Sequence, residues 1–263
     1  MTRRISSAAF ALALLGIIAA AACGDSPTTP TPTPPSPPPV TPTPPPTPPA
    51  PPPTLGITKV LAFGDSMTEG TTSPPLATWT FRLDAGLSRS YPYKLQSLIT
   101  SRYSAQTIQV FNGGKAGEFT YNARDRFNGL LSEARPEVVL LIEGANDLNT
   151  PFGPTEGVNA RVTATVSNIE DMVRDAGFRG IPVMVATLPP QRPGAPKAGA
   201  ATFLNRYNDA LKSMAANKGA QLVDVGAQIP LAEIGQDGLH PTEAGYQHMA
   251  EIWLEAIKGR FER

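Results

Sequence analysis

Short apolar runs that lack polar alternation are the feature that most constrains how this chain can fold. A run of this kind is typical of a strand buried on both faces, because neither side of the strand meets water. The pattern is clearest at residues 57–63, 137–143 and 181–188. With two shorter candidates at residues 107–111 and 221–225, we expect five strands.

Segments with helical spacing of apolar residues separate these runs. They lie at residues 91–103, 155–176, 197–218 and 242–258, and we expect Thr242 to cap the last helix. Strands that alternate with helices predict an α/β fold, with a parallel sheet sandwiched between helices. Ligands of such sheets bind at the carboxyl ends of the strands. Ser66, Gly117, Asn146 and the loop at Pro189 all follow expected strand ends, so they should share one rim.

The first residues of the chain are typical of an export signal. A positive start, Thr2-Arg3-Arg4, precedes an apolar stretch at residues 8–22 that is too short for a permanent membrane span. The stretch ends in Ala20-Ala21-Ala22 and runs straight into Cys23, which resembles a bacterial lipoprotein box. We therefore expect Cys23 to be lipidated and to tether the protein to a membrane of the cell envelope. The alternative is a plain signal peptide cut after an Ala-x-Ala site.

Residues 28–53 alternate proline and threonine with little else. Such a segment has almost no apolar side chains to bury, and proline removes backbone donors, so we expect a solvated polyproline-type spacer of ~3.1 Å per residue. A recognition site for a proline-binding module is the alternative. The sequence thus predicts a signal peptide at 1–22, a disordered linker at 23–54 and one globular domain at 55–263.

Charge and residue usage exclude several classes of function. The formal net charge is zero, and nothing indicates a basic face for nucleic acid. Cys23 is the only cysteine, so no intramolecular disulfide can form. His240 and His248 are the only histidines, too few with a single cysteine for a typical zinc site. We expect no metal and no cofactor.

The sequence Gly64-Asp65-Ser66 puts a serine hydroxyl at the end of the first expected strand. Backbone N–H groups are free where the next helix would start, and they favour the negative charge that forms when a serine attacks a carbonyl. Asp237 lies three residues before His240 and can orient an imidazole that takes the proton of Ser66. The structural alternatives are an N-cap serine and a surface turn.

Four blocks resemble the GDSL or SGNH hydrolase family, in the family's order. They are Gly64-Asp65-Ser66, residues 112–118, Gly144-Ala145-Asn146-Asp147 and Asp237-Gly238-Leu239-His240. The resemblance implies a flavodoxin-like three-layer α/β/α sandwich around a central, mostly parallel five-stranded sheet. It implies a catalytic triad of Ser66, Asp237 and His240. It also implies an oxyanion hole made by the N–H groups of Ser66 and Gly117 and the amide of Asn146, with Gly114 as the alternative glycine.

The resemblance implies an exported, membrane-tethered serine esterase that cleaves carboxylic esters through an acyl-enzyme. The family accepts acetylated sugars, simple esters, lysophospholipids and acyl thioesters, and the sequence does not choose among them. An address at the outer membrane, in the periplasm or at the cell surface favours small acyl groups on glycans. One alternative is a lysophospholipase, lipase-like or thioesterase activity. Another is a non-catalytic surface protein that binds carbohydrate on the same fold.

Several other polar residues receive structural interpretations. We expect Asp65 and Asp147 to brace their loops through backbone hydrogen bonds, and Glu69 and Glu118 to be solvated. His248, inside the last expected helix, is a poor candidate for catalysis.

Two loops are candidates for the walls of a pocket. The segment at residues 70–91 directly follows the nucleophile and is either a lid or wall, or a surface loop whose aromatic residues fill a gap in the core. The loop at residues 189–199, with Gln191 and Arg192, would then line the opposite wall.

Overall fold

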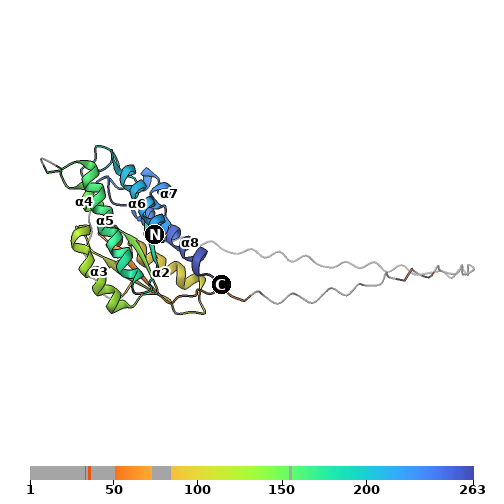
Figure 1. The fold of residues 1–263 in the computed structure, drawn as a ribbon. Helices are drawn as coiled ribbons and strands as arrows, with labels where there is room; N and C mark the ends of the chain where they lie inside the picture. Colours follow the sequence, from red (N-terminus) through yellow and green to blue (C-terminus); the bar gives the residue numbers. More distant parts are fainter. Residues whose placement is uncertain (1–32, 34, 37–50, 73–83, 154–155) are drawn as a thin grey trace, which may run out of the picture. The chain divides into compact units, whose positions relative to one another are not determined.

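The computed structural model describes residues 33, 35–36, 51–72, 84–153 and 156–263. By its internal contacts the chain divides into two units, Met1–Pro49 and Ala50–Arg263, and the helices and strands below belong to the second (Figure 1). The expected signal peptide, Cys23 and most of the expected linker lie outside the described residues. The boundaries predicted there stay predictions.

Five parallel strands form the central sheet, in the order β2-β1-β3-β4-β5. This is the strand order of flavodoxin-like folds. Every pair of neighbouring strands is parallel, so the expected fold class is confirmed. The strands are β1 (Lys59–Gly64), β2 (Gln109–Gly114), β3 (Val138–Ile142), β4 (Val183–Ala186) and β5 (Gln221–Val223).

Helices cover both faces of the sheet (Figure 1). One layer pairs α2 (Tyr91–Arg102) with α8 (Glu243–Phe261). The other packs α3 (Thr120–Ala134) on α5 (Val158–Gly177), and α5 on α6 (Leu204–Lys218). Short helices follow strand ends or connect elements: α1 (Ser66–Glu69), α4 (Ala145–Asn149), α7 (Val225–Gln228) and the 3-10 helix η1 (Leu231–Glu233).

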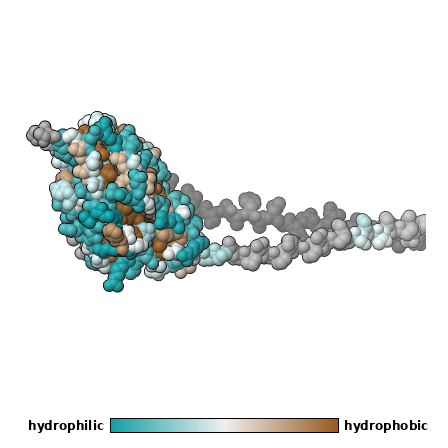
Figure 2. Space-filling model, in the orientation of Figure 1, coloured by the Kyte–Doolittle hydropathy of each residue, from teal (hydrophilic) through white to brown (hydrophobic). Residues whose placement is uncertain are grey.

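The core sits between the sheet and both helical layers. β1 and β3 are central, and Val60, Leu61 and Leu140 have no exposed surface. The rings of Phe63 and Phe127 meet edge to face at 5.0 Å between centroids, which joins the sheet to α3. On the visible face of the domain, Figure 2 shows mostly hydrophilic residues with apolar patches between them. Among the described residues, no helix is both long and apolar enough to cross a bilayer.

Two helices differ from the sequence-based expectation. The helix expected from residue 197 begins only at Leu204. The residues before it form turns held by distant partners: Lys197 N–H donates to the Asp237 carbonyl at 2.9 Å, and Ala200 N–H donates to Asn149 Oδ1 at 2.9 Å. The helix α3 was not expected at all, although Ala123, Phe127 and other apolar residues at helical spacing form its buried face.

Other boundaries fall close to the predictions. The strand β2 continues to Gly114, three residues past the expected end, because Asn112, Gly113 and Gly114 still pair with β1. Thr242 caps α8 as expected, accepting a hydrogen bond from Gly245 N–H at 3.2 Å.

Candidate active site

A tight connection between β1 and α1 places Ser66. Asp65 caps α1, and its Oδ1 accepts a hydrogen bond from Met67 N–H at 2.9 Å. Gly64 lies so close to β3 that a Cβ there would come within 2.0 Å of the Ile142 carbonyl oxygen. The chain then leaves α1 at Gly70, which has a φ of +101° that favours glycine. These contacts fix Ser66 at the first residue of a helix, at the carboxyl edge of the sheet.

The side chain of Asn112, at the end of β2, also supports α1. Its Nδ2 donates to the Thr68 carbonyl at 3.0 Å, and its Oδ1 accepts from Gly114 N–H at 2.9 Å. Asn112 is fully buried, so these bonds compensate for the loss of water. The sequence analysis placed Asn112 in a family block but gave it no role.

A second turn, just before α8, aims the imidazole of His240. Asp237 Oδ1 accepts hydrogen bonds from the N–H groups of Leu239 and His240, each at 3.1 Å. Gly238 has a φ of +84°, which this turn needs. Asp237 Oδ2 then lies 2.6 Å from His240 Nδ1, and His240 Nε2 lies 2.9 Å from Ser66 Oγ. The structure thus brings Ser66, Asp237 and His240 together across 174 residues of sequence.

The surroundings of His240 favour a neutral ring. Burial lowers the pKa of His240 below its usual value, although the hydrogen bond and the charge of Asp237 act in the opposite direction. A neutral ring that donates Nδ1–H to Asp237 leaves Nε2 to accept the hydroxyl proton of Ser66. Burial raises the pKa of Asp237, but hydrogen bonds from His240 and the backbone outweigh it, so the pKa is lowered overall. The pair can therefore act as a general base near neutral pH.

The expected oxyanion donors lie beside Ser66. A depression of about 230 Å³ is lined by Ser66, Thr71, Ala116, Gly117, Asn146, Lys197, Leu239 and His240. Asn146 Nδ2 donates to the Glu118 carbonyl at 2.8 Å, which orients the amide and leaves its second hydrogen for a ligand. Gly117 has a φ of +75° and faces open space.

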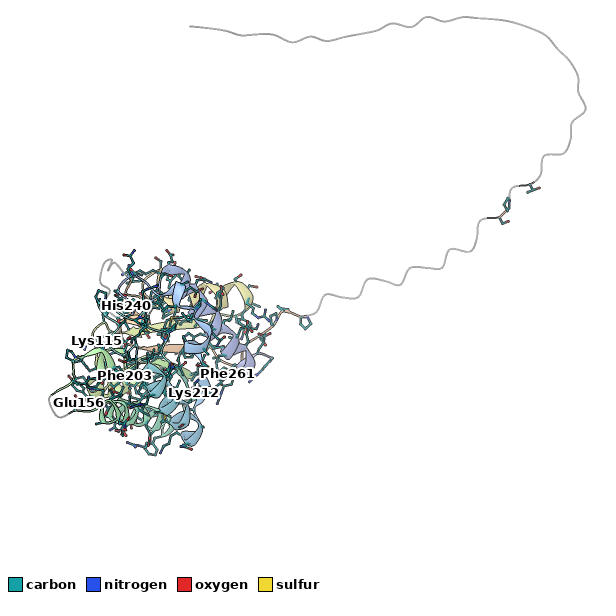
Figure 3. The ribbon with its side chains drawn as sticks, turned by 90° about the horizontal axis from the view of Figure 1, so that it is seen from above. Lys115, Glu156, Phe203, Lys212, His240 and Phe261 are labelled. Atoms are coloured by element: carbon teal, nitrogen blue, oxygen red, sulfur yellow. The ribbon has the colours of Figure 1, made fainter. Side chains whose placement is uncertain are left out.

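The alternative glycine, Gly114, has a different environment. A Cβ at Gly114 would lie 2.0 Å from Glu69 N, so this residue packs against α1. The geometry therefore favours Gly117 as the donor. In the view of Figure 3, His240 and Lys115, which follows β2, lie toward one side of the domain, and Phe261 lies toward the other.

Glu69 and Glu118 are buried, so the expectation that both are solvated was wrong. Glu118 forms an ion pair with Arg126, whose Nε lies 2.9 Å from Oε1. Arg126 belongs to α3, the helix that was not expected, so its charge could not be placed beside Glu118. Glu69 accepts a hydrogen bond from Thr71 Oγ1 at 3.2 Å.

Two aspartates brace their loops as expected. Asp65 caps α1, and Asp147 accepts from Thr120 N–H at 3.0 Å and from Thr120 Oγ1 at 2.7 Å. His248 is half-buried on α8, and its Nδ1 lies 2.9 Å from Glu233 Oε2. It does not line the depression at Ser66.

Of the two expected walls, the loop at residues 189–199 does line the depression, but through Lys197 and not through the two residues that were named. Gln191 is buried and accepts from Ala200 N–H at 3.1 Å, while Arg192 donates to the Ile234 carbonyl at 2.9 Å, so both hold the loop in place. Lys197 and Leu239 line the depression instead. No periodicity or motif identifies Lys197, because its place depends on the turn that precedes α6. Residues 73–83, the middle of the other expected wall, lie outside the described part of the chain.

The described residues contain no group of three or more His, Cys, Asp or Glu side chains that could hold a metal ion. The expectation of a site without metal or cofactor stays a prediction.

Residues 62–248 match the model of the GDSL-like Lipase/Acylhydrolase family. The chain belongs to this family. A multidomain esterase of Ruminococcus flavefaciens is 25% identical over 161 residues, which cover 60% of this chain and 20% of that protein. An arylesterase of Vibrio mimicus is 24% identical over 202 residues, 76% of this chain and 88% of that protein. Family and relatives confirm the enzyme class, a hydrolase of carboxylic esters.

Solved structures of similar proteins share the fold. A lipase/acylhydrolase from Enterococcus faecalis has a TM-score of 0.61 and 23% identity, with 78% of this chain and 97% of that chain covered. An acetylxylan esterase from Geobacillus stearothermophilus has a TM-score of 0.61 and 19% identity, with 77% and 94% covered. Because both identities are below 25%, the similarity to these structures shows a shared fold and nothing further.

Proposed function

We propose that this chain cleaves carboxylic esters through an acyl-enzyme on Ser66. The observation that carries the proposal is the continuous chain of contacts from Asp237 through His240 to Ser66, at 2.6 and 2.9 Å. Ser66 Oγ would attack the ester carbonyl while His240 Nε2 takes its proton. The imidazolium, stabilised by Asp237, would then protonate the leaving alcohol, and water would hydrolyse the acyl-enzyme by the same route.

The negative charge of the tetrahedral intermediate would be held by three donors: the N–H groups of Ser66 and Gly117 and the free hydrogen of the Asn146 amide. The Glu118 carbonyl keeps that amide in place before substrate arrives. A preorganised donor of this kind stabilises the transition state without reorganising during the reaction.

The test is ester hydrolysis by the purified domain with p-nitrophenyl acetate as substrate. The wild type should turn over, and Ser66→Ala should lose hydrolysis while its melting temperature stays nearly unchanged. An organophosphonate should label the wild-type protein at Ser66 alone. Labelling of another serine, or near-normal turnover by Ser66→Ala, contradicts the mechanism.

For the substrate, we propose small acyl groups, such as acetyl, on a glycan. The depression at Ser66 is small, about 230 Å³, and suits a short acyl group. The similar structure from Geobacillus stearothermophilus is an acetylxylan esterase, which supports an acetylated glycan as the substrate. Lipase-like, lysophospholipase or thioesterase activity is the alternative. A profile of p-nitrophenyl esters from acetate to decanoate decides between them, since a peak at long chains contradicts our proposal.

The other alternative, a carbohydrate-binding protein without chemistry, has no use for a serine, an imidazole and a carboxylate bonded in series. The bonded series in this chain therefore favours an enzyme. Absence of turnover on every ester tested, together with binding of glycan, would support the non-catalytic alternative.

For the location, we propose an exported lipoprotein of the bacterial cell envelope, tethered through Cys23. The apolar stretch that runs into the chain's only cysteine supports this proposal. The wild type should fractionate with membranes, and Cys23→Ser should release the protein or stall its processing. Recovery of a soluble wild-type protein that starts at another residue would refute lipidation. Removal of residues 28–53 should leave the activity in solution intact.

A further inference from the structure

A second hollow, of about 360 Å³, is lined by residues that follow those of the Ser66 depression closely along the chain. It is larger than that depression and falls at the lower end of small-molecule sites, which span about 300–1,000 Å³. We call it the aromatic hollow. Its lining comes from the start of α3, the segment that follows Asn146, and the first half of α5, including Phe119, Tyr121, Asp147, Thr150, Arg161 and Asn168.

The same two segments that carry the expected oxyanion donors also contribute to the aromatic hollow. Phe119 follows Gly117 by two residues, and Asp147 follows Asn146 directly. The hydrogen bond from Asn146 Nδ2 to the Glu118 carbonyl, at 2.8 Å, holds these two segments side by side. A substrate whose carbonyl oxygen meets Gly117 and Asn146 would therefore extend from one cavity into the other.

The chemistry of the lining favours a ring with an apolar face and polar edges. The rings of Phe119 and Tyr121 are 5.3 Å apart between centroids, and Tyr121 is 65% exposed. An exposed aromatic face packs against the C–H groups of a sugar, while hydroxyl and amide groups at its edge bond the sugar hydroxyls. Thr150 Oγ1 already donates to the Asn146 carbonyl at 2.8 Å, and Asn168 Nδ2 donates to Thr120 Oγ1 at 2.9 Å. The Thr150 hydroxyl oxygen can still accept, and the Asn168 amide keeps a second hydrogen and its oxygen for a ligand.

Charge argues for a neutral ligand. Arg161 is the lining residue with a positive charge, and it forms an ion pair with Glu156, which also lines the hollow. Arg161 further donates to the Thr150 carbonyl at 2.9 Å, which ties down the segment after Asn146. In Figure 3, Glu156 lies toward the same side of the domain as His240. A guanidinium used in this way gives no surplus charge for a phosphate or carboxylate group.

We propose that the aromatic hollow binds the alcohol part of the substrate, a neutral pyranose next to the acylated hydroxyl, with Tyr121 as its stacking platform. The acyl group would then occupy the depression at Ser66. This inference rests on the proposed ester hydrolysis, and it adds the part of the substrate that sets specificity.

The first test compares two acetate esters that differ in the alcohol. One is an O-acetylated neutral oligosaccharide, and the other is ethyl acetate, followed by pH-stat. The ratio of kcat/KM for the oligosaccharide over kcat/KM for ethyl acetate should fall about tenfold in Tyr121→Ala, and Tyr121→Phe should restore most of it. The control is Phe178→Ala. Phe178 is 82% exposed and lies just past the other end of α5, so this variant should keep the wild-type ratio.

The second test does not depend on chemistry. Titration of the protein with the unacetylated oligosaccharide should give a Kd that rises about tenfold in Tyr121→Ala and stays unchanged in Phe178→Ala. An unchanged Kd in Tyr121→Ala overturns the sugar site, even if ester hydrolysis is established. If Tyr121→Ala loses hydrolysis of long-chain ethyl esters but keeps hydrolysis of the acetylated oligosaccharide, the hollow holds an acyl chain. That result also overturns the proposal. Absence of all hydrolysis alongside Tyr121-dependent binding contradicts only the proposed function.

Discussion

Asp65 and Asp237 each lie within one turn of the serine–histidine pair, but their surroundings have opposite effects. Asp237 accepts hydrogen bonds from the His240 ring and from two backbone N–H groups, which hold its pKa below the usual value. Asp65 is fully buried, and burial raises its pKa to about 7 although Met67 N–H opposes the rise. Its Oδ2 is buried without a hydrogen-bond partner among the described residues.

The two aspartates show that the environment in this fold distinguishes a catalytic carboxylate from a structural carboxyl group. The carboxylate at the rim stays charged, as a group that stabilises an imidazolium must. The carboxyl beneath it is easily protonated and acts as a helix cap. Glu143, which follows β3, resembles Asp65 in its environment. Its carboxyl group is buried without hydrogen-bond partners among the described residues, and burial raises its pKa well above the usual value. Environment, and not residue type, assigns the roles.

The largest effect should come from the imidazole that touches both Ser66 and Asp237. His240→Ala should lower kcat on the order of 10⁴-fold or more, because among the described residues no other side chain is placed to take the Ser66 proton. The matched control is His248→Ala, which removes an imidazole that bonds Glu233 and does not line the depression at Ser66. An equal loss of kcat in the two variants, both folded by circular dichroism, would show that His240 is not the general base.

Asn146→Ala should have the next largest effect. Loss of one oxyanion donor costs roughly 2.7–4 kcal/mol of transition-state stabilisation, or about 10²–10³ in kcat. Steady-state kinetics on p-nitrophenyl acetate should show this loss mainly in kcat, with KM little changed. A change confined to KM would mean that Asn146 only binds substrate.

Asp237→Ala should cost less, about tenfold to a hundredfold in kcat, if the imidazole can still be oriented by its packing. The pH profile is the sharper measurement. Because burial lowers the pKa of His240 and Asp237 opposes that effect, removing Asp237 should lower the pKa further. The acid limb of kcat/KM should therefore lie at lower pH in Asp237→Ala than in the wild type. A move to higher pH would contradict the proposed balance.

The smallest effect on activity, but a clear one on stability, is expected for Asp65→Asn. In the wild type the folded-state pKa is raised from 3.8 to about 7, so the folded protein keeps a proton that the unfolded chain has lost. Stability should therefore fall as pH rises through this range, by up to ~1.4 kcal/mol per pH unit for such a group. Asparagine still accepts from Met67 N–H but does not titrate.

Urea unfolding at pH 4.5, 5.5, 6.5 and 7.5 measures this slope, which should be shallower in Asp65→Asn than in the wild type. Glu143→Gln should flatten the same slope independently, since Glu143 is shifted in the same direction. Identical slopes in all three proteins would mean that these carboxyls are solvated in the folded state.

The features of this molecule that depend on residues close together in the sequence could be predicted without the structure. The turn of Asp237-Gly238-Leu239-His240 is built by hydrogen bonds within four residues, and Asp65 caps α1 within two. Five strands and a mostly parallel sheet also followed from apolar runs and a family resemblance. Such features can be predicted from the sequence because each is set by local backbone geometry and by the pattern of apolar residues.

The tertiary structure alone decided which charges are buried and where the cavities lie. Arg126 reaches Glu118 from a helix that was not expected, and Lys197 lines the site through turns bonded to Asp237 and to the segment after Asn146. The aromatic hollow needs α5 beside the residues that follow Gly117. Burial, pKa shifts and cavity shape depend on segments far apart in sequence, and no local pattern records how those segments pack.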